Sequence, residues 1–178
     1  MVGNPLMNFL LHGIRGNRVR HGFPRNVRQG DVVCVESEGL LKRYGIWTGE
    51  KFILYGKDRW EKYSVHEESF GDFIRGAEHF AICQFPKHYG RPTEWMQTIQ
   101  TGSIVMPQAQ IWELLEMLWK TERYKLYSAE ETVRRAESRL GTDGFPTSEH
   151  FAIWCKTGIA ESHELGSMRK ILNQVIVY

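Results

Sequence analysis

Residues 147–158 read TSEHFAIWCKTG and predict a short helix around which the rest of the fold is arranged. Small hydroxyl residues open the stretch, where they can accept hydrogen bonds from the free N–H groups of a first helical turn. Gly158 closes it, as glycine commonly does at the end of a helix. Phe151, Trp154 and Cys155 follow at i, i+3 and i+4, which places them on one apolar face. We therefore expect this helix to pack against a sheet formed by other parts of the chain.

Four apolar runs earlier in the chain predict the strands of that sheet, and they cover residues 32–35, 44–48, 51–56 and 79–85. The runs are rich in β-branched and aromatic residues, which favour strands. Gly49 and its polar neighbours mark a hairpin turn between the second run and the third. We expect the polar segment 57–68 to be a loop. The predicted fold class is α+β, with an antiparallel sheet over residues 31–86 packed against helices.

Two further helices are predicted between the last strand and residues 147–158. Residues 108–125 follow a proline and carry an apolar stripe of helical period, flanked by Trp112 and Trp119. Residues 128–141 begin with Ser-Ala-Glu-Glu, the pattern of a capping box. The apolar surface of the first helix either packs on the domain or uses Trp112 and Trp119 to bind a partner, because tryptophans commonly anchor interfaces.

The composition is that of an ordinary globular domain. The chain has 178 residues, of which 42% are apolar, enough for one core. Its net charge of +2 is too small to indicate nucleic-acid binding by itself. Cys34, Cys83 and Cys155 lack metal-ligand spacing, and we expect buried free thiols in a cytoplasmic protein without a metal or cofactor. The chain has no run of about 18 apolar residues, so no membrane span is expected.

Residues 1–29 form a basic extension before the predicted domain. Their arginines suit an acidic protein, a nucleic acid or an anionic lipid, or they belong to a solvated surface segment. Phe23 is the one aromatic residue among the arginines, so the arm offers little aromatic surface on which nucleic-acid bases could stack. The candidate binding residues of this arm are Arg15, Arg18 and Arg20.

The pentapeptide TSEHF at residues 147–151 resembles the Asn-Cys-Glu-His-Phe signature of the lecithin retinol acyltransferase-like family. That family belongs to the papain-like NlpC superfamily with a permuted chain, so the resemblance implies a permuted papain-like fold. Residues 30–31 and 44–49 also match the family's Gly-Asp and Tyr-Gly-Ile patterns, and the similarity spans about residues 30–86 and 127–172. Residues 30–178 would then be one domain with a helical insertion at about 88–125.

All three catalytic positions of that family are changed in this chain. The resemblance places the nucleophilic cysteine on Ser148 and the two histidines on Arg43 and Tyr55. A serine hydroxyl needs a base, which a permanently protonated guanidinium cannot supply and a phenol with a pKa of about 10 supplies poorly. Since a general base is worth about 10²–10⁴ in rate, the site is expected to have lost acyl transfer or ester hydrolysis.

The leading expectation is therefore a pseudoenzyme that acts by binding a protein partner or a small anionic or acyl ligand. A helix N-terminus with Arg43, Tyr55 and Ser148 nearby suits a carboxylate or phosphate. Three alternatives stay open: Arg43 is paired with an acid such as Glu36 or Glu38 and Ser148 is a helix cap; an acyltransferase or hydrolase uses Ser148 with a relocated base; or the arginine arm binds nucleic acid.

Overall fold

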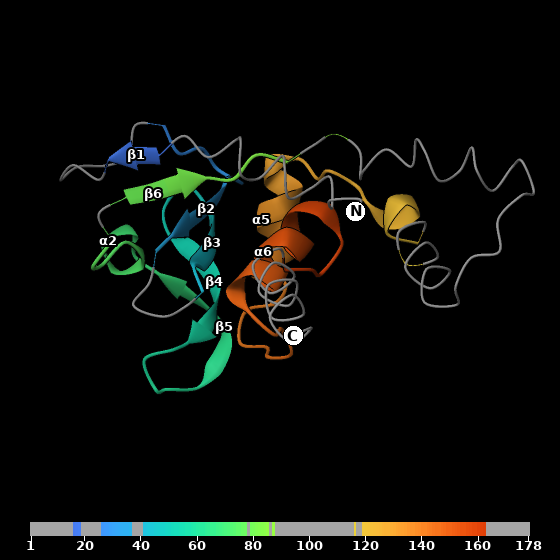
Figure 1. Cartoon of the computed structure of the whole chain (residues 1–178). Coiled ribbons are helices and arrows are strands. Elements are labelled where there is room, and N and C mark those ends of the chain that lie inside the picture. Colours follow the sequence, from blue (N-terminus) through green and yellow to red (C-terminus); the bar gives the residue numbers. More distant parts are fainter. Residues whose placement is uncertain are drawn as a thin grey trace, which may run out of the picture.

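The computed structural model describes residues 16–18, 26–36, 41–77, 79–85, 87, 116 and 119–162. It confirms the predicted α+β class (Figure 1). Its elements in chain order are β1 (Gly16–Arg18), β2 (Val32–Val35), β3 (Arg43–Trp47), β4 (Phe52–Lys57), β5 (Tyr63–Glu68), α2 (Phe70–Phe73), β6 (His79–Ile82), α5 (Ala129–Glu137) and α6 (Ser148–Thr157).

The strands form one antiparallel sheet in the order β1-β6-β2-β3-β4-β5 (Figure 1). From β2 to β5 the chain runs as a meander in which each strand pairs with the next. It then crosses the sheet through α2, so that β6 lies beside β2. The short strand β1 pairs with β6 and adds three residues of the predicted N-terminal extension to the sheet.

The prediction that residues 57–68 form a loop is wrong for their second half. Tyr63–Glu68 is strand β5, which pairs with β4 along its whole length. Only Val65 of this strand is buried, so its sequence lacks the apolar run that marked the other strands. Edge strands need fewer apolar residues because one side of the strand, and often one face, stays in contact with water.

Helices cover both faces of the sheet (Figure 1). Successive side chains of a strand point to opposite faces, and here apolar side chains occur on both. On one face, Val32 and Ile46 belong to a buried cluster with Phe151 and Cys155 of α6. On the other face, Phe52 belongs to a separate cluster that includes residues of β2, β3, α2 and β6. The sheet therefore separates two apolar cores, one beneath α5 and α6 and one beneath α2.

The predicted boundaries of the 147–158 helix are confirmed. Thr147 is the N-cap of α6, and its hydroxyl accepts a hydrogen bond from the backbone N–H of His150 at 3.3 Å. Gly158 ends the helix with a φ of +80°. Ser128 caps α5 in the same way, although that helix ends at Glu137 and residues 138–141 form turns instead of a last helical segment.

The predicted helix at 108–125 lies largely outside the described residues. Residues 119–123 are helical, and so is residue 116, whereas residues 124–125, which were predicted to end this helix, are not helical. The other residues of the predicted insertion, and the arginine arm apart from β1 and residues 26–29, lie outside the described residues.

Gly30, two residues before β2, contacts the start of α5 and the end of α6. Its φ of +79° suits glycine, and a Cβ placed there would lie 2.4 Å from the Cα of Ala129 at the start of α5. The Lys156 ammonium near the end of α6 donates to the Gly30 carbonyl at 3.3 Å. Burial lowers the pKa of Lys156, so this ammonium lies in an apolar setting in which the carbonyl is a needed partner.

We predict that Gly30→Ala lowers the free energy of unfolding far more than Gly76→Ala. Gly76 has nearly the same φ, +78°, but a Cβ there would have no neighbour within 4 Å. Gly76→Ala should cost about 1–2 kcal/mol for the backbone conformation alone, whereas Gly30→Ala adds a clash with the backbone of α5. Urea unfolding measures both, and equal losses would contradict the close approach of Gly30 to Ala129.

Candidate functional site

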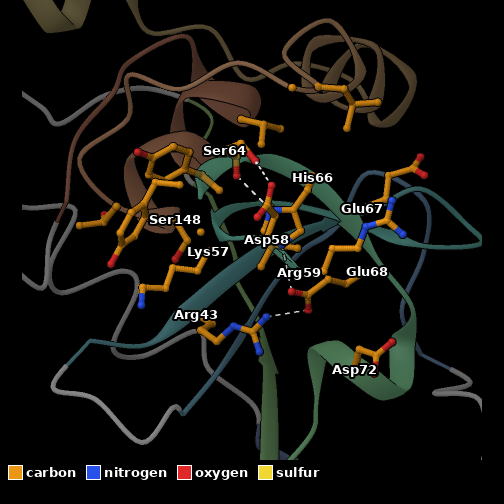
Figure 2. A pocket seen from close by; sticks show the side chains of 18 of the residues that line it. Arg43, Lys57, Asp58, Arg59, Ser64, His66, Glu67, Glu68, Asp72 and Ser148 are labelled. Carbon is orange, nitrogen blue, oxygen red and sulfur yellow. Dashed lines mark hydrogen bonds and ion pairs between the residues drawn. The ribbon is translucent and has the colours of Figure 1, made fainter. Parts of the chain in front are cut away.

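An open cleft of about 1290 Å³ runs along β5 and the ends of β3 and β4, beside the first residues of α6 (Figure 2). The sheet brings the three positions matched to the catalytic residues to its wall. Arg43 comes from β3, Tyr55 from β4 and Ser148 from α6, and all three line the cleft. The three side chains nevertheless contact different partners.

The Ser148 hydroxyl is bound to the backbone of the chain just before and within β3. It accepts a hydrogen bond from the Tyr44 N–H at 3.1 Å and donates one to the Lys42 carbonyl at 3.5 Å. The N-cap role falls to Thr147, one residue earlier. Ser148 is therefore the first residue of α6 and links it to the sheet.

The Arg43 side chain is directed toward Glu68 of β5 rather than toward Ser148 (Figure 2). Its guanidinium donates to the Glu68 carboxylate at 2.6 Å and to the Phe73 carbonyl of α2 at 3.5 Å. It also lies 5.5 Å from the centroid of the Phe73 ring. The alternative of an ion-paired Arg43 is thus the one observed, and its partner is Glu68 and not Glu36; Glu38 lies outside the described residues.

Tyr55 lies on the opposite face of the sheet, beneath α6. Its ring packs near those of Tyr63 and Phe145, with centroids 6.2 and 5.9 Å away. Burial, and then the nearby Asp143 and Tyr63, raise the pKa of Tyr55 above its usual value. The phenol therefore keeps its proton at neutral pH and cannot serve as a general base there.

His66 and Glu68 are the site residues that the sequence reading missed. His66 Nε2 lies 3.1 Å from the Glu68 carboxylate, and Nδ1 lies 3.0 Å from the Ser64 carbonyl. Both ring nitrogens face acceptors, an arrangement that only the doubly protonated imidazolium satisfies. The hydrogen bond to Glu68 accordingly raises the pKa of His66. The alternating Ser64-x-His66-x-Glu68 pattern on one strand face was the available signal.

Glu68 joins His66 and Arg43 into one charged network on the α2 side of the sheet. Burial alone would raise the pKa of Glu68, but the hydrogen bonds and charges of His66 and Arg43 outweigh it and hold that pKa below its usual value. With both nitrogens occupied, His66 has none free to take a proton from a serine. The network therefore suits a structural role in shaping the cleft better than a catalytic one.

His150, the histidine of the TSEHF stretch, does not line the cleft. Its Nδ1 lies 2.9 Å from the Thr147 hydroxyl at the start of α6. Burial lowers the pKa of His150, so the ring is neutral at pH 7. The ring of His150 therefore contacts the N-cap residue of α6 and not Ser148.

The remaining predicted binding residues lie away from the cleft or outside the described part of the chain. Trp119 is 49% exposed, and the Arg123 guanidinium lies 4.3 Å from its ring centroid. Arg18 belongs to β1, of which only the backbone is described. Arg15, Arg20 and Trp112 lie outside the described residues.

The described residues contain no group of three or more histidine, cysteine or acidic side chains placed to hold a metal ion. None of their helices combines the length and apolar character needed to cross a membrane. Cys34 and Cys155 are buried free thiols and Cys83 is a partly buried one, as the sequence predicted.

No protein-family model matches the sequence, and no curated protein matches it significantly. The function of the cleft is therefore inferred from its own residues.

We predict opposite effects of pH on stability for variants of His66 and His150. The raised pKa of His66 means that its stabilisation is complete below its unfolded pKa, about 6.5, and is lost as pH rises through the folded pKa. The lowered pKa of His150 means that its stabilisation is complete above about pH 6.5 and is lost as pH falls through the folded value.

The measurement is urea unfolding between pH 5 and 8 for wild type, His66→Gln and His150→Gln. The difference between wild type and His66→Gln should shrink as pH rises, and the difference between wild type and His150→Gln should grow. A His66→Gln difference that stays constant over this range would contradict the hydrogen bonds of both ring nitrogens.

Proposed function

We propose that this chain is a non-catalytic relative of the lecithin retinol acyltransferase-like family, with the permuted papain-like arrangement, that acts by binding a protein partner at its cleft. The observation that carries the proposal is the Ser148 hydroxyl, which is bound to the Tyr44 N–H and the Lys42 carbonyl. A nucleophile must instead share its proton with a base. Positions 43, 55 and 148 all line one cleft, which agrees with the family resemblance, but Arg43 and Tyr55 project from opposite faces of the sheet.

The surrounding side chains support the loss of chemistry. Arg43 is occupied by Glu68, Tyr55 holds its proton more firmly than a free phenol, and both nitrogens of His66 are bonded. None of them can accept the proton that a serine hydroxyl must lose. The same contacts disfavour a small anion as the ligand, because the guanidinium that would grip it already has a carboxylate partner.

A protein partner fits the cleft better than a small molecule. The cleft is open, and three large apolar side chains at its edge, Trp60, Tyr63 and Leu140, are well exposed. Small-molecule sites are usually enclosed and bury most of their ligand. Protein interfaces, in contrast, concentrate their binding energy in a few exposed aromatic and arginine side chains.

A serine-based acyltransferase or hydrolase is the second candidate, and one observation favours it. Ser148 lines the cleft at the first position of α6, where the helix dipole would stabilise developing negative charge. The two candidates differ in whether the hydroxyl ever carries an acyl group. Chemical trapping of that group therefore distinguishes them.

We predict that p-nitrophenyl acetate leaves no acetyl group on Ser148 of the wild-type protein. Peptide mapping by mass spectrometry reads the adduct, and ester hydrolysis is followed alongside. Because general-base help is worth about 10²–10⁴ in rate, its absence should leave wild type and Ser148→Ala hydrolysing the ester equally slowly.

Ser148→Cys is the matched variant, since it restores the family's thiol by replacing one atom. An acetyl group on Cys at position 148 together with none on wild type would place the loss of chemistry at the nucleophile and leave the proposal standing. An acetyl group on wild-type Ser148 that Ser148→Ala abolishes would overturn the proposal in favour of the acyl-enzyme.

A further inference from the structure

The hairpin between β4 and β5 carries an unpartnered apolar surface at the edge of the cleft. We call it the hairpin rim and define it as Arg59, Trp60, Tyr63 and Leu140, all of which line the cleft. Trp60 is 65% exposed, Tyr63 60% and Leu140 40%. These fractions are high for such large apolar side chains, so the rim is a candidate interaction surface.

The rim also carries a cation that the described part of the chain does not neutralise by an ion pair. The Arg59 guanidinium lies 3.7 Å from the centroid of the Trp60 ring, and no described acid forms a salt bridge with it. The hairpin's own acids are committed elsewhere. Glu61 pairs with Lys57 at 2.6 Å, and Asp58 accepts hydrogen bonds from the Trp60 and Lys62 N–H groups.

Apart from Lys42, the other cations that line the cleft are in ion pairs. Arg43 and His66 share Glu68, Arg75 pairs with Asp72, and Lys57 pairs with Glu61. An acidic group that approaches the hairpin would therefore meet a complementary charge at Arg59, next to the exposed apolar side chains. Charge complementarity at the rim thus favours a partner that combines carboxylates with apolar side chains.

The rim is held in shape before any partner arrives. The two backbone hydrogen bonds to Asp58, at 2.8 and 3.0 Å, fix the turn that carries Arg59 and Trp60. The hydrogen bond to the Lys62 N–H, and then that to Trp60, help to hold the pKa of Asp58 below its usual value, so the carboxylate that organises the turn is ionised at neutral pH. A preformed surface loses less conformational entropy on binding.

We propose that the hairpin rim binds an acidic, apolar-containing segment of a protein partner, an inference that rests on the binding function proposed above. An apolar side chain of that segment packs on Trp60, Tyr63 and Leu140, and a carboxylate pairs with the outer edge of the Arg59 guanidinium. A single-stranded nucleic acid would have less aromatic surface to stack on, because Arg59 covers one face of Trp60.

The test selects random displayed peptides on the full-length wild-type protein and on Arg59→Glu. The wild type should enrich peptides that combine Asp or Glu with large apolar residues, and Arg59→Glu should reject these and enrich basic ones. A synthetic copy of an enriched peptide then gives dissociation constants by fluorescence anisotropy. Trp60→Ala should weaken its binding at least about tenfold, as expected for an interface hot spot.

The chain offers a matched control in its second exposed arginine–tryptophan pair. Arg123 lies over Trp119 much as Arg59 lies over Trp60, but neither control residue lines the cleft. Arg123→Glu and Trp119→Ala should leave peptide binding unchanged. Since all four side chains are exposed, the variants should unfold at the urea concentration of the wild type, which separates a binding defect from misfolding.

Several outcomes would overturn the inference. They are enrichment of no peptide, the same peptides on wild type and Arg59→Glu, or loss of binding in the Trp119 and Arg123 variants. Binding of oligothymidylate or of phosphatidylserine vesicles that Arg59→Glu abolishes would reassign the rim to nucleic acid or lipid. A peptide that binds the cleft without Arg59 and Trp60 would sink this inference while the proposed binding function stands, whereas the acetylation assay tests that function's loss of chemistry separately.

Discussion

The two hydrogen bonds of the Ser148 hydroxyl to the backbone of residues 42 and 44 fix the position of α6 on the sheet. At its first residue, the helix is linked to the Tyr44 N–H and the Lys42 carbonyl. Near its last, the Lys156 ammonium is linked to the Gly30 carbonyl. Each hydrogen bond contributes only about 0.5–1.5 kcal/mol net, but together they tie both ends of one helix to the sheet. The apolar face of α6 is thereby placed over β3 and β4, where it closes one of the two cores.

That constraint has a chemical consequence. A serine hydroxyl can donate and accept at once, so it satisfies both a backbone N–H and a backbone carbonyl. A cysteine thiol is a weak donor and a weak acceptor and would hold the same two groups poorly. Serine at position 148 is thus well suited to anchor a helix and poorly suited to attack an acyl group without a base. Stability and catalysis make opposite demands on this one side chain, and the observed contacts favour stability.

The sequence was informative wherever one local pattern had one physical cause. Thr147 and Gly158 marked the two ends of α6 correctly. The free N–H groups of a first helical turn need an acceptor such as a hydroxyl, and a left-handed residue at a helix end is usually glycine. The apolar runs located β2, β3, β4 and β6, although β3 and β4 are each displaced by about one residue from the predicted spans. Strand β5 was missed because its polar side chains are satisfied by each other and by Arg43, an arrangement that hydropathy cannot register.

The partner of Arg43 illustrates the same limit. Acids at positions 36 and 38 lie near the neighbouring strand β2 in sequence, and they were the natural expectation. The observed partner, Glu68, comes from β5, with β4 lying between the two strands. Glycine at position 45, where a Cβ would lie 2.9 Å from the Phe73 ring, lets α2 pack closely against β3 beside Arg43. Arg43 meets Glu68 and Phe73 only in the folded chain, where α2 packs on the sheet beside β3.

The distribution of satisfied and unsatisfied groups divides the cleft into two parts with different roles. Along β5 the charges neutralise one another, and such internally bonded networks hold shape without attracting a partner. At the hairpin, Arg59 and the exposed side chains beside it have no comparable arrangement among the described residues. Under the proposed binding function, the β5 network keeps the cleft in shape, and the hairpin is the part of the cleft available to a partner.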